Sequence, residues 1–147
     1  MATTYKKLIA TKLTTDFRDA AEIVEETIPD LKPHEVLIRN VYAGINATDV
    51  NITAGRYQPG AKPPIELGAE AAGIVEEVGS EVRHLAPAAA VVTSTLGGGY
   101  REYNVVRASN ALPVDEPSPE ALSIMVSGLT ASIALEEVGD MSSGETV

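Results

Sequence analysis

The first two thirds of the chain carry short apolar runs, alternating or rich in β-branched residues, that are typical of strands. We expect strands at residues 5–13, 21–28, 36–45, 71–78, 91–95 and 100–106. Turns with glycine or proline separate these runs, and Leu96-Gly97-Gly98-Gly99 is expected to join the last two as a flexible hairpin loop. Many short strands with such turns predict a mainly β fold, either a small barrel or a sandwich.

One segment inside this β region has a helical pattern. Residues 46–55 fit one or two helical turns, because Asn46 or Thr48 can cap the first turn and Gly55 suits the position after the last one. We therefore expect a short helix between the third and fourth strands.

The pattern becomes helical again after Pro113. Ser118-Pro119 predicts a helix start, with a capping serine followed by proline at the first helical position. Apolar helical runs follow at 121–126 and 129–138, and Ser127-Gly128 is expected to separate them. This tail does not fit the core of a small barrel, so it predicts the beginning of a separate unit.

Composition narrows the classes of function. The chain has 147 residues and a formal net charge of −10, which disfavours binding to nucleic acid. No uninterrupted apolar run approaches the roughly 20 residues of a membrane span, so no membrane insertion is expected. The chain has no cysteine and two histidines, which argues against a zinc site and excludes thiolate chemistry.

Four motifs, in order, resemble the medium-chain dehydrogenase/reductase superfamily. Each is weak alone, but together they cover most of the chain, and they are most similar to the quinone oxidoreductase and prostaglandin reductase branch. The motifs are "GINATD" at 44–49, "GAEAAGIVEEVG" at 68–79, "GYREY" at 99–103 and "SGLTA" at 127–131.

The resemblance implies a fold and an activity. The implied fold is a GroES-like β-barrel catalytic domain at residues 1–125, with 126–147 as a junction helix toward a missing Rossmann domain. The implied reaction is the NADPH-dependent, zinc-independent reduction of an activated C=C bond, in enones such as 15-oxo-prostaglandins, or of a quinone. Without the nucleotide-binding domain we expect no turnover by this chain alone. The branch also implies an intracellular homodimer, cytoplasmic or else peroxisomal or mitochondrial.

Two sequence departures from the superfamily bear on metal binding and folding. Zinc-dependent members have a cysteine ligand where Asn46 stands and a histidine ligand where Ala69 stands, so two ligand positions are empty together. Relatives usually carry "P-G-D-x-V" where this chain has "PAAAV" at 87–91, and alanine suits a turn poorly.

Four residues are candidates for the active site. Asn46 can hydrogen-bond a ribose hydroxyl or a substrate oxygen, or act only as a helix cap. Tyr57 can donate to an enolate oxygen or to the nicotinamide ribose, or simply cover the barrel end. Asn51 is a weaker substrate-side candidate. The resemblance places the Thr130 hydroxyl near the nicotinamide, although a helical threonine can also bond its own turn.

Other polar residues favour structural roles. Glu70 is surrounded by glycine and alanine, and we expect it to anchor the missing domain, so it should have no strong charged partner within this chain. The remaining tyrosines are expected to pack on strands and both histidines to be solvated. These residues are Tyr5, Tyr42, Tyr100, Tyr103, His34 and His84.

Two rival functions stay open. A zinc-type alcohol dehydrogenase would share the fold, and the absence of cysteine argues against it. A non-catalytic barrel that serves as a binding or assembly module is the second rival, and the junction tail argues against it.

Overall fold

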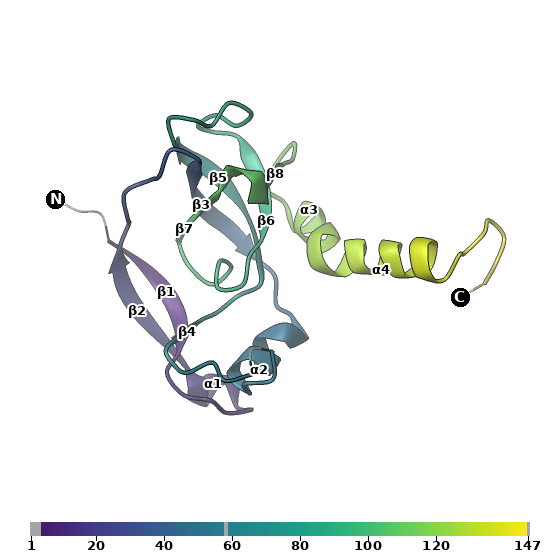
Figure 1. The fold of residues 1–147 in the computed structure, drawn as a ribbon, viewed down its shortest axis with the longest axis horizontal. Coiled ribbons are helices and arrows are strands. Elements are labelled where there is room, and N and C mark those ends of the chain that lie inside the picture. Colours follow the sequence, from purple (N-terminus) through teal and green to yellow (C-terminus); the bar gives the residue numbers. More distant parts are fainter. Residues whose placement is uncertain (1–3, 58, 147) are drawn as a thin grey trace.

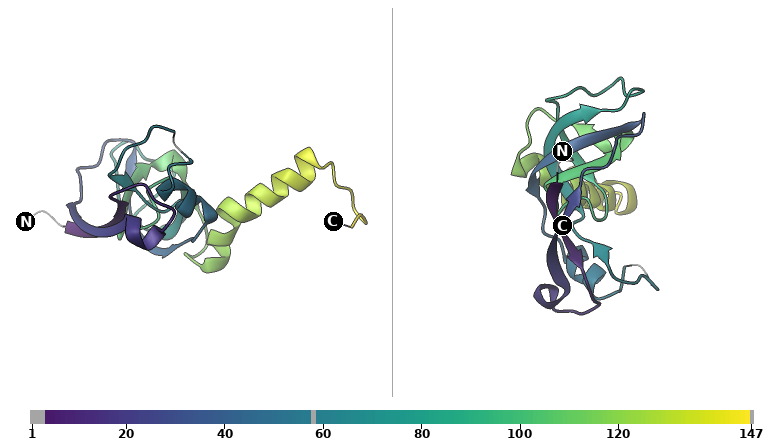
Figure 2. Two further views of the ribbon diagram at one scale, coloured as in Figure 1. Left: turned by 90° about the horizontal axis from the view of Figure 1, so that it is seen from below. Right: turned by 90° about the vertical axis from the view of Figure 1, so that its left-hand side faces the viewer.

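The computed structural model describes residues 4–57 and 59–146. Its main feature is a body of strands from which a helical segment projects (Figures 1 and 2). The predicted ranges 1–125 and 126–147 include residues 1–3, 58 and 147, which lie outside the described part. The expected mainly β architecture followed by a helical tail is confirmed.

The strands form two sheets. The smaller sheet has the order β2-β1-β4, and the larger has the order β7-β3-β5-β6-β8, with antiparallel pairing throughout. The strands are β1 Thr4–Ala10, β2 Ala21–Thr27, β3 Glu35–Ala43, β4 Ile65–Glu66, β5 Glu70–Val78, β6 Ala90–Ser94, β7 Tyr103–Arg107 and β8 Ala111–Pro113.

The expected hairpin between β6 and β7 is wrong. β6 pairs with β5 and β8, whereas β7 pairs with β3 on the other side of the sheet. The glycine loop between them is buried rather than flexible, because its backbone packs on Gly68: the Gly97 N–H donates to the Gly68 carbonyl at 2.8 Å. A Cβ at Gly68 would meet backbone atoms of Gly99 and Tyr100, so this crossing requires glycine.

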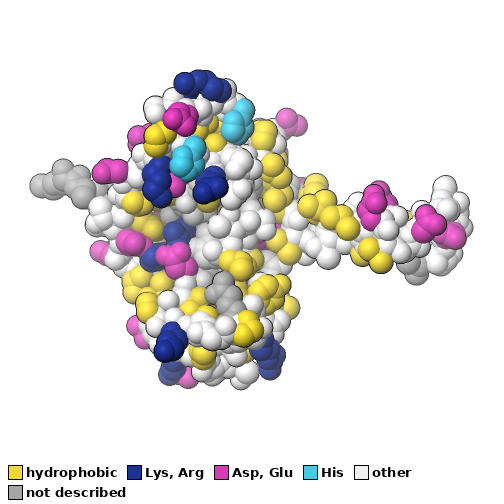
Figure 3. All heavy atoms as spheres, viewed as in Figure 1, with side chains coloured by type: hydrophobic (Ala, Val, Ile, Leu, Met, Phe, Trp, Pro, Cys, Tyr) yellow, Lys and Arg dark blue, Asp and Glu magenta, His cyan; other side chains and the backbone are white. Residues whose placement is uncertain are grey.

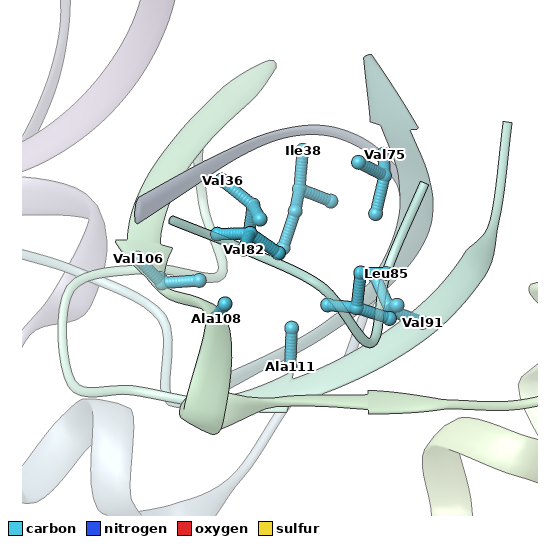
Figure 4. Close-up of a cluster of buried hydrophobic side chains, with 9 residues drawn as sticks. All are labelled: Val36, Ile38, Val75, Val82, Leu85, Val91, Val106, Ala108 and Ala111. Atoms are coloured by element: carbon cyan, nitrogen blue, oxygen red, sulfur yellow. The ribbon is translucent and has the colours of Figure 1, made fainter. Parts of the chain in front are cut away.

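The larger sheet curls around an aliphatic core (Figure 4). Alternate residues of β3 and β5 point inward, as the period of two in a strand dictates, and Ile38 and Val75 are both 1% exposed. Side chains from the turns close the core from the other side, among them Val82 and Leu85. Burial of such side chains stabilises the sheet by about 1.5–3 kcal/mol each.

The helical segments differ in length and exposure. The short helix expected at 46–55 is present as α2, whereas α1 and η1 were not expected. The tail is helical without a break from residue 119 to 138, so the separation expected at Ser127-Gly128 is wrong, and both residues lie in a π-helical segment. The segments are α1 Phe17–Ala20, α2 Ala47–Thr53, η1 Ala108–Asn110, α3 Pro119–Ser123, η2 Ile124–Gly128, α4 Leu129–Ile133 and η3 Ala134–Val138.

The helical tail is largely exposed. Apolar side chains lie along it in Figure 3, and Ile124 and Val138 are 63% and 80% exposed. By length and composition alone, Pro119–Val138 could cross a membrane, which a search for uninterrupted apolar runs does not reveal because glutamates lie near both ends. A helix that packs on another domain passes the same test, so the observation by itself indicates an unpartnered apolar face.

Three consecutive alanines at 88–90 lie in the turn before β6 and at the start of that strand. The first of them, Ala88, has a left-handed conformation. Ala88 has a φ of 70°, and it donates to the Val75 carbonyl at 2.8 Å while the Val75 N–H donates to Ala89. Two residues thus face Val75, which is the arrangement of a β-bulge whose first position favours glycine. An alanine Cβ in this conformation costs roughly 1–2 kcal/mol.

We therefore expect Ala88→Gly to raise the free energy of unfolding by about 0.5–1 kcal/mol, since the gain exceeds the entropy cost of glycine. Urea denaturation followed by circular dichroism measures this. Ala89→Gly is the matched control, because Ala89 has no positive φ and should lose stability. Equal effects of the two substitutions would contradict the strain at Ala88.

Candidate functional site

The candidate site is built around the first turn of α2. Asn46 precedes the helix in an extended conformation, and its backbone N–H donates to Asp49 Oδ2 at 2.8 Å. Asp49 is 2% exposed, so its carboxylate is held inside the fold by the turn that it caps. The spacing Asn46-x-x-Asp49 thereby fixes the position where Asn46 enters the site.

Tyr100 provides the second donor to this carboxylate. Its hydroxyl donates to Asp49 Oδ2 at 2.7 Å, and its ring packs edge-on against Phe17 at 6.2 Å. Burial raises the pKa of Tyr100 well above its usual range, and the hydrogen bond to Asp49 raises it further. The phenol therefore keeps its proton and donates it to Asp49, which makes Tyr100 a poor source of protons for a ligand.

Glu70 approaches Asn46 from the start of β5. It is 5% exposed, and its Oε1 accepts from Asn46 Nδ2 at 2.9 Å while its Oε2 accepts from the Val126 backbone N–H at 3.1 Å. Within residues 4–57 and 59–146, no lysine, arginine or histidine forms an ion pair with Glu70. What it anchors in the described residues is the helical tail.

A cavity of about 560 Å³ lies beside these residues. Its volume falls in the range of small-molecule sites, and its lining is mostly apolar with a few polar groups. Asn46, Asp49 and Tyr100 are the polar members, and the apolar members are Leu8, Phe17, Ile45 and Val50. Ile45 is 91% exposed, so this wall of the cavity opens to the surface.

The other predicted site residues lie elsewhere. Tyr57 is 51% exposed in the loop after α2, Asn51 accepts from Arg56 Nη1 at 3.2 Å, and Thr130 is exposed on α4. None of the three lines the cavity that contains Asn46. Their roles in the site stay predictions.

Sequence reasoning missed Asp49 and assigned Tyr100 only to packing. Tyr100 does pack on Phe17, but it precedes β7 and its hydroxyl joins the polar network. The cap-like spacing of Asn46 and Asp49 was a usable signal for a buried carboxylate. Nothing in the sequence places Tyr100 beside a residue 51 positions earlier.

The site does not fit a zinc ion. Ala69 offers no donor atom, and the amide of Asn46 is a poor ligand for zinc compared with the cysteine of zinc-dependent relatives. In the part of the chain that the structure describes, no three His, Cys, Asp or Glu residues lie close enough to hold a metal. The residue types here suit hydrogen bonding to a ligand instead.

Tyr100→Phe tests the network. Removing the hydroxyl deprives a buried carboxylate of a donor, so we expect the free energy of unfolding to fall by about 2 kcal/mol. Tyr42→Phe is the control, because Tyr42 is 42% exposed, and it should change little. Denaturant titration measures both, and equal small effects would contradict the buried bond.

The raised pKa of Tyr100 also predicts a pH dependence. The folded chain holds this proton to higher pH than the unfolded chain, so the resulting stability is complete below the ordinary tyrosine pKa of 10.0 and is lost as pH rises beyond it. Between about pH 9 and 11 the native chain should lose more free energy of unfolding than Tyr100→Phe. Parallel pH profiles for the two proteins would refute this.

Comparison with known proteins identifies relatives of the chain. Prostaglandin reductase-3 of Mus musculus is 38% identical over 145 residues, which are 98% of this chain and 38% of that protein. This chain therefore spans less than half of the relative's length.

Two solved structures share the fold. Escherichia coli quinone oxidoreductase, complexed with NADPH, superposes with a TM-score of 0.78 at 28% identity, covering 90% of this chain and 41% of that one. The cobalt- and zinc-bound alcohol dehydrogenase of Pyrobaculum aerophilum has a TM-score of 0.83 at 27% identity, covering 97% and 51%. Both support the GroES-like barrel that the sequence motifs imply.

The family model described as the alcohol dehydrogenase GroES-like domain matches residues 32–116. These residues run from the turn before β3 to beyond β8 and include Asn46, Asp49, Glu70 and Tyr100. The match spans more than half of the chain, so the chain belongs to the alcohol dehydrogenase GroES-like domain family, in the quinone oxidoreductase and prostaglandin reductase branch of the medium-chain dehydrogenase/reductases.

Proposed function

We propose that this chain is the catalytic half of a zinc-independent, NADPH-dependent reductase of activated C=C bonds, in enones such as 15-oxo-prostaglandins, or of quinones. The observation that carries the proposal is Asn46, whose amide is held by Glu70 at the wall of an apolar cavity, at the position of a zinc ligand in metal-dependent relatives. The 38% identity to a prostaglandin reductase supports the same reaction class.

The chain's own residues bind and orient the substrate and the cofactor. The apolar wall of Leu8, Phe17 and Val50 suits the hydrocarbon part of an enone and excludes water from it. Asn46 hydrogen-bonds a ribose hydroxyl or a substrate oxygen. NADPH supplies the hydride when bound, and the protein supplies position and electrostatics.

Tyr57 is the better proton donor to a developing enolate oxygen. Tyr100 is committed to Asp49 and its pKa is raised, so its proton is held in the network. Tyr57 is half exposed beyond α2 and is free to face a ligand that enters from outside this chain. Thr130, exposed on α4, contributes a hydroxyl on the side where the cofactor would lie.

The nucleotide-binding half has to come from outside residues 1–147. The three glycines at 97–99 are buried against Gly68 and are not followed by a helix, so they form no phosphate-binding turn. We infer that the exposed apolar face of the helical tail packs against that other half. A zinc-type alcohol dehydrogenase fits less well, because Asn46 and Ala69 stand at two positions where zinc-dependent relatives have ligands.

Activity depends on completing the protein. We expect the 147-residue chain to reduce neither a 15-oxo-prostaglandin nor a quinone with NADPH. A hybrid in which it replaces the matched segment of mouse Prostaglandin reductase-3 should reduce the enone, with loss of NADPH absorbance as the assay. In the hybrid, Asn46→Ala should lower kcat/KM about tenfold or more.

Asn110→Ala is the matched control for the hybrid, since Asn110 lies in η1, outside the lining of the cavity. It should leave kcat/KM unchanged. Turnover by the isolated chain, or a folded hybrid indifferent to Asn46→Ala, would overturn the proposal.

Zinc independence has its own test. Dialysis of the chain or the hybrid against zinc, followed by metal analysis, should find no stoichiometric metal, because the ligand positions hold Asn46 and Ala69. One tightly bound zinc per chain would restore the alcohol dehydrogenase alternative.

A further inference from the structure

One buried carboxylate, that of Glu70, contacts both the candidate site and the helical tail. Glu70 Oε1 accepts from the side chain of Asn46, and Glu70 Oε2 accepts from the backbone of Val126, 56 residues away. The two contacts use the two oxygens of one rigid group. A displacement of either partner therefore changes the position of the other or breaks a bond.

The contact with Val126 falls where the helix departs from α geometry. Val126 lies inside the π-helical segment η2, between α3 and α4. A side chain that inserts into the hydrogen-bond ladder of a helix can kink it, and π segments recur at functional sites. Glu70 thus fixes the position of the tail at one defined turn.

The contact with Asn46 fixes the side-chain amide. An ionised carboxylate only accepts hydrogen bonds, so Asn46 must turn its nitrogen toward Glu70 and not its oxygen. The Glu70 contact therefore decides which of the two amide orientations Asn46 adopts. The donor and acceptor that Asn46 offers to a ligand are set by Glu70.

The socket around Glu70 is shaped for this arrangement. A Cβ on Gly44 would collide with Cγ, Cδ and Oε1 of Glu70, so the carboxylate occupies the space that any larger residue at 44 would fill. In the described part of the chain no cation pairs with Glu70, which leaves these two hydrogen bonds as its principal compensation. Losing either hydrogen bond therefore lowers the free energy of unfolding.

We propose that Glu70 is a positioning residue that sets the orientation of the Asn46 amide and couples it to the helical tail at Val126. The proposal rests on the proposed role of Asn46 in the site. Movement of the tail at η2 is transmitted to Asn46 through the Glu70 carboxylate. The position of η2 therefore determines the orientation of the Asn46 amide.

Nuclear magnetic resonance of the 147-residue chain tests the coupling without cofactor or substrate. Two signals report it: the side-chain NH₂ of Asn46 and the backbone amide of Val126. Glu70→Gln replaces one acceptor oxygen with an NH₂ group and removes the negative charge that both donors face, so we expect both signals to shift and exchange of the Val126 amide to speed up about tenfold. Glu77→Gln, an exposed change on the same strand, should leave both signals in place.

Two further variants keep the test valid if Glu70→Gln fails to fold. Gly44→Ala should displace the intact Glu70 side chain and shift the same two signals. Asn46→Ala should shift the Val126 amide by way of Glu70. A change at only one of the two signals in Glu70→Gln or Gly44→Ala, or an unchanged Val126 in Asn46→Ala, overturns the coupling.

Failure of this proposal is distinguishable from failure of the proposed function. If the two signals move together but Asn46→Ala leaves the hybrid fully active, the coupling stands as a structural link and the catalytic assignment of Asn46 fails. If Asn46→Ala inactivates the hybrid but the signals do not move together, Asn46 acts in the site and Glu70 does not position it.

Discussion

The structure depends on a buried carboxylate that pairs with no cation in the described part of the chain. Glu70 must keep both oxygens hydrogen-bonded, because a buried charge without partners is far too costly to retain. Its two donors, Asn46 and Val126, come from segments far apart in the chain. These two hydrogen bonds therefore join the helix-capping turn, strand β5 and the helical tail beside the cavity that Asn46 lines.

Small residues make that convergence possible. Gly44 leaves room for the carboxylate, and Gly68 and Gly99 let two backbone segments cross where a Cβ would collide. The glycine loop thereby becomes a buried crossing that carries Tyr100 to Asp49. At Ala88 no glycine is present, and an alanine adopts the left-handed conformation that favours glycine. Both places favour a glycine. Where glycine is present the backbone packs closely, and where alanine replaces it the turn is strained.

Local pattern was enough to predict most strands and the helices at 46–55 and beyond 118, because each has a strong period or a clear cap. It could not predict how β6 and β7 pair, since β8 is three residues long and only the folded sheet shows that it takes the place beside β6. In the site, sequence motifs indicated Asn46 and the small socket of Glu70. The contact between Tyr100 and Asp49 depends on tertiary folding, so no local signal could reveal it.

The position of Val126 also bears on Thr130, the other residue that the family resemblance assigns to the cofactor. The two are four residues apart on the tail, so they lie about one helical turn apart. A carboxylate that holds Val126 on one side and Asn46 on the other thus fixes the distance between the barrel and this turn of the tail. In the proposed function, Thr130 does not line the cavity, and Glu70 sets the position of its turn of the tail relative to Asn46.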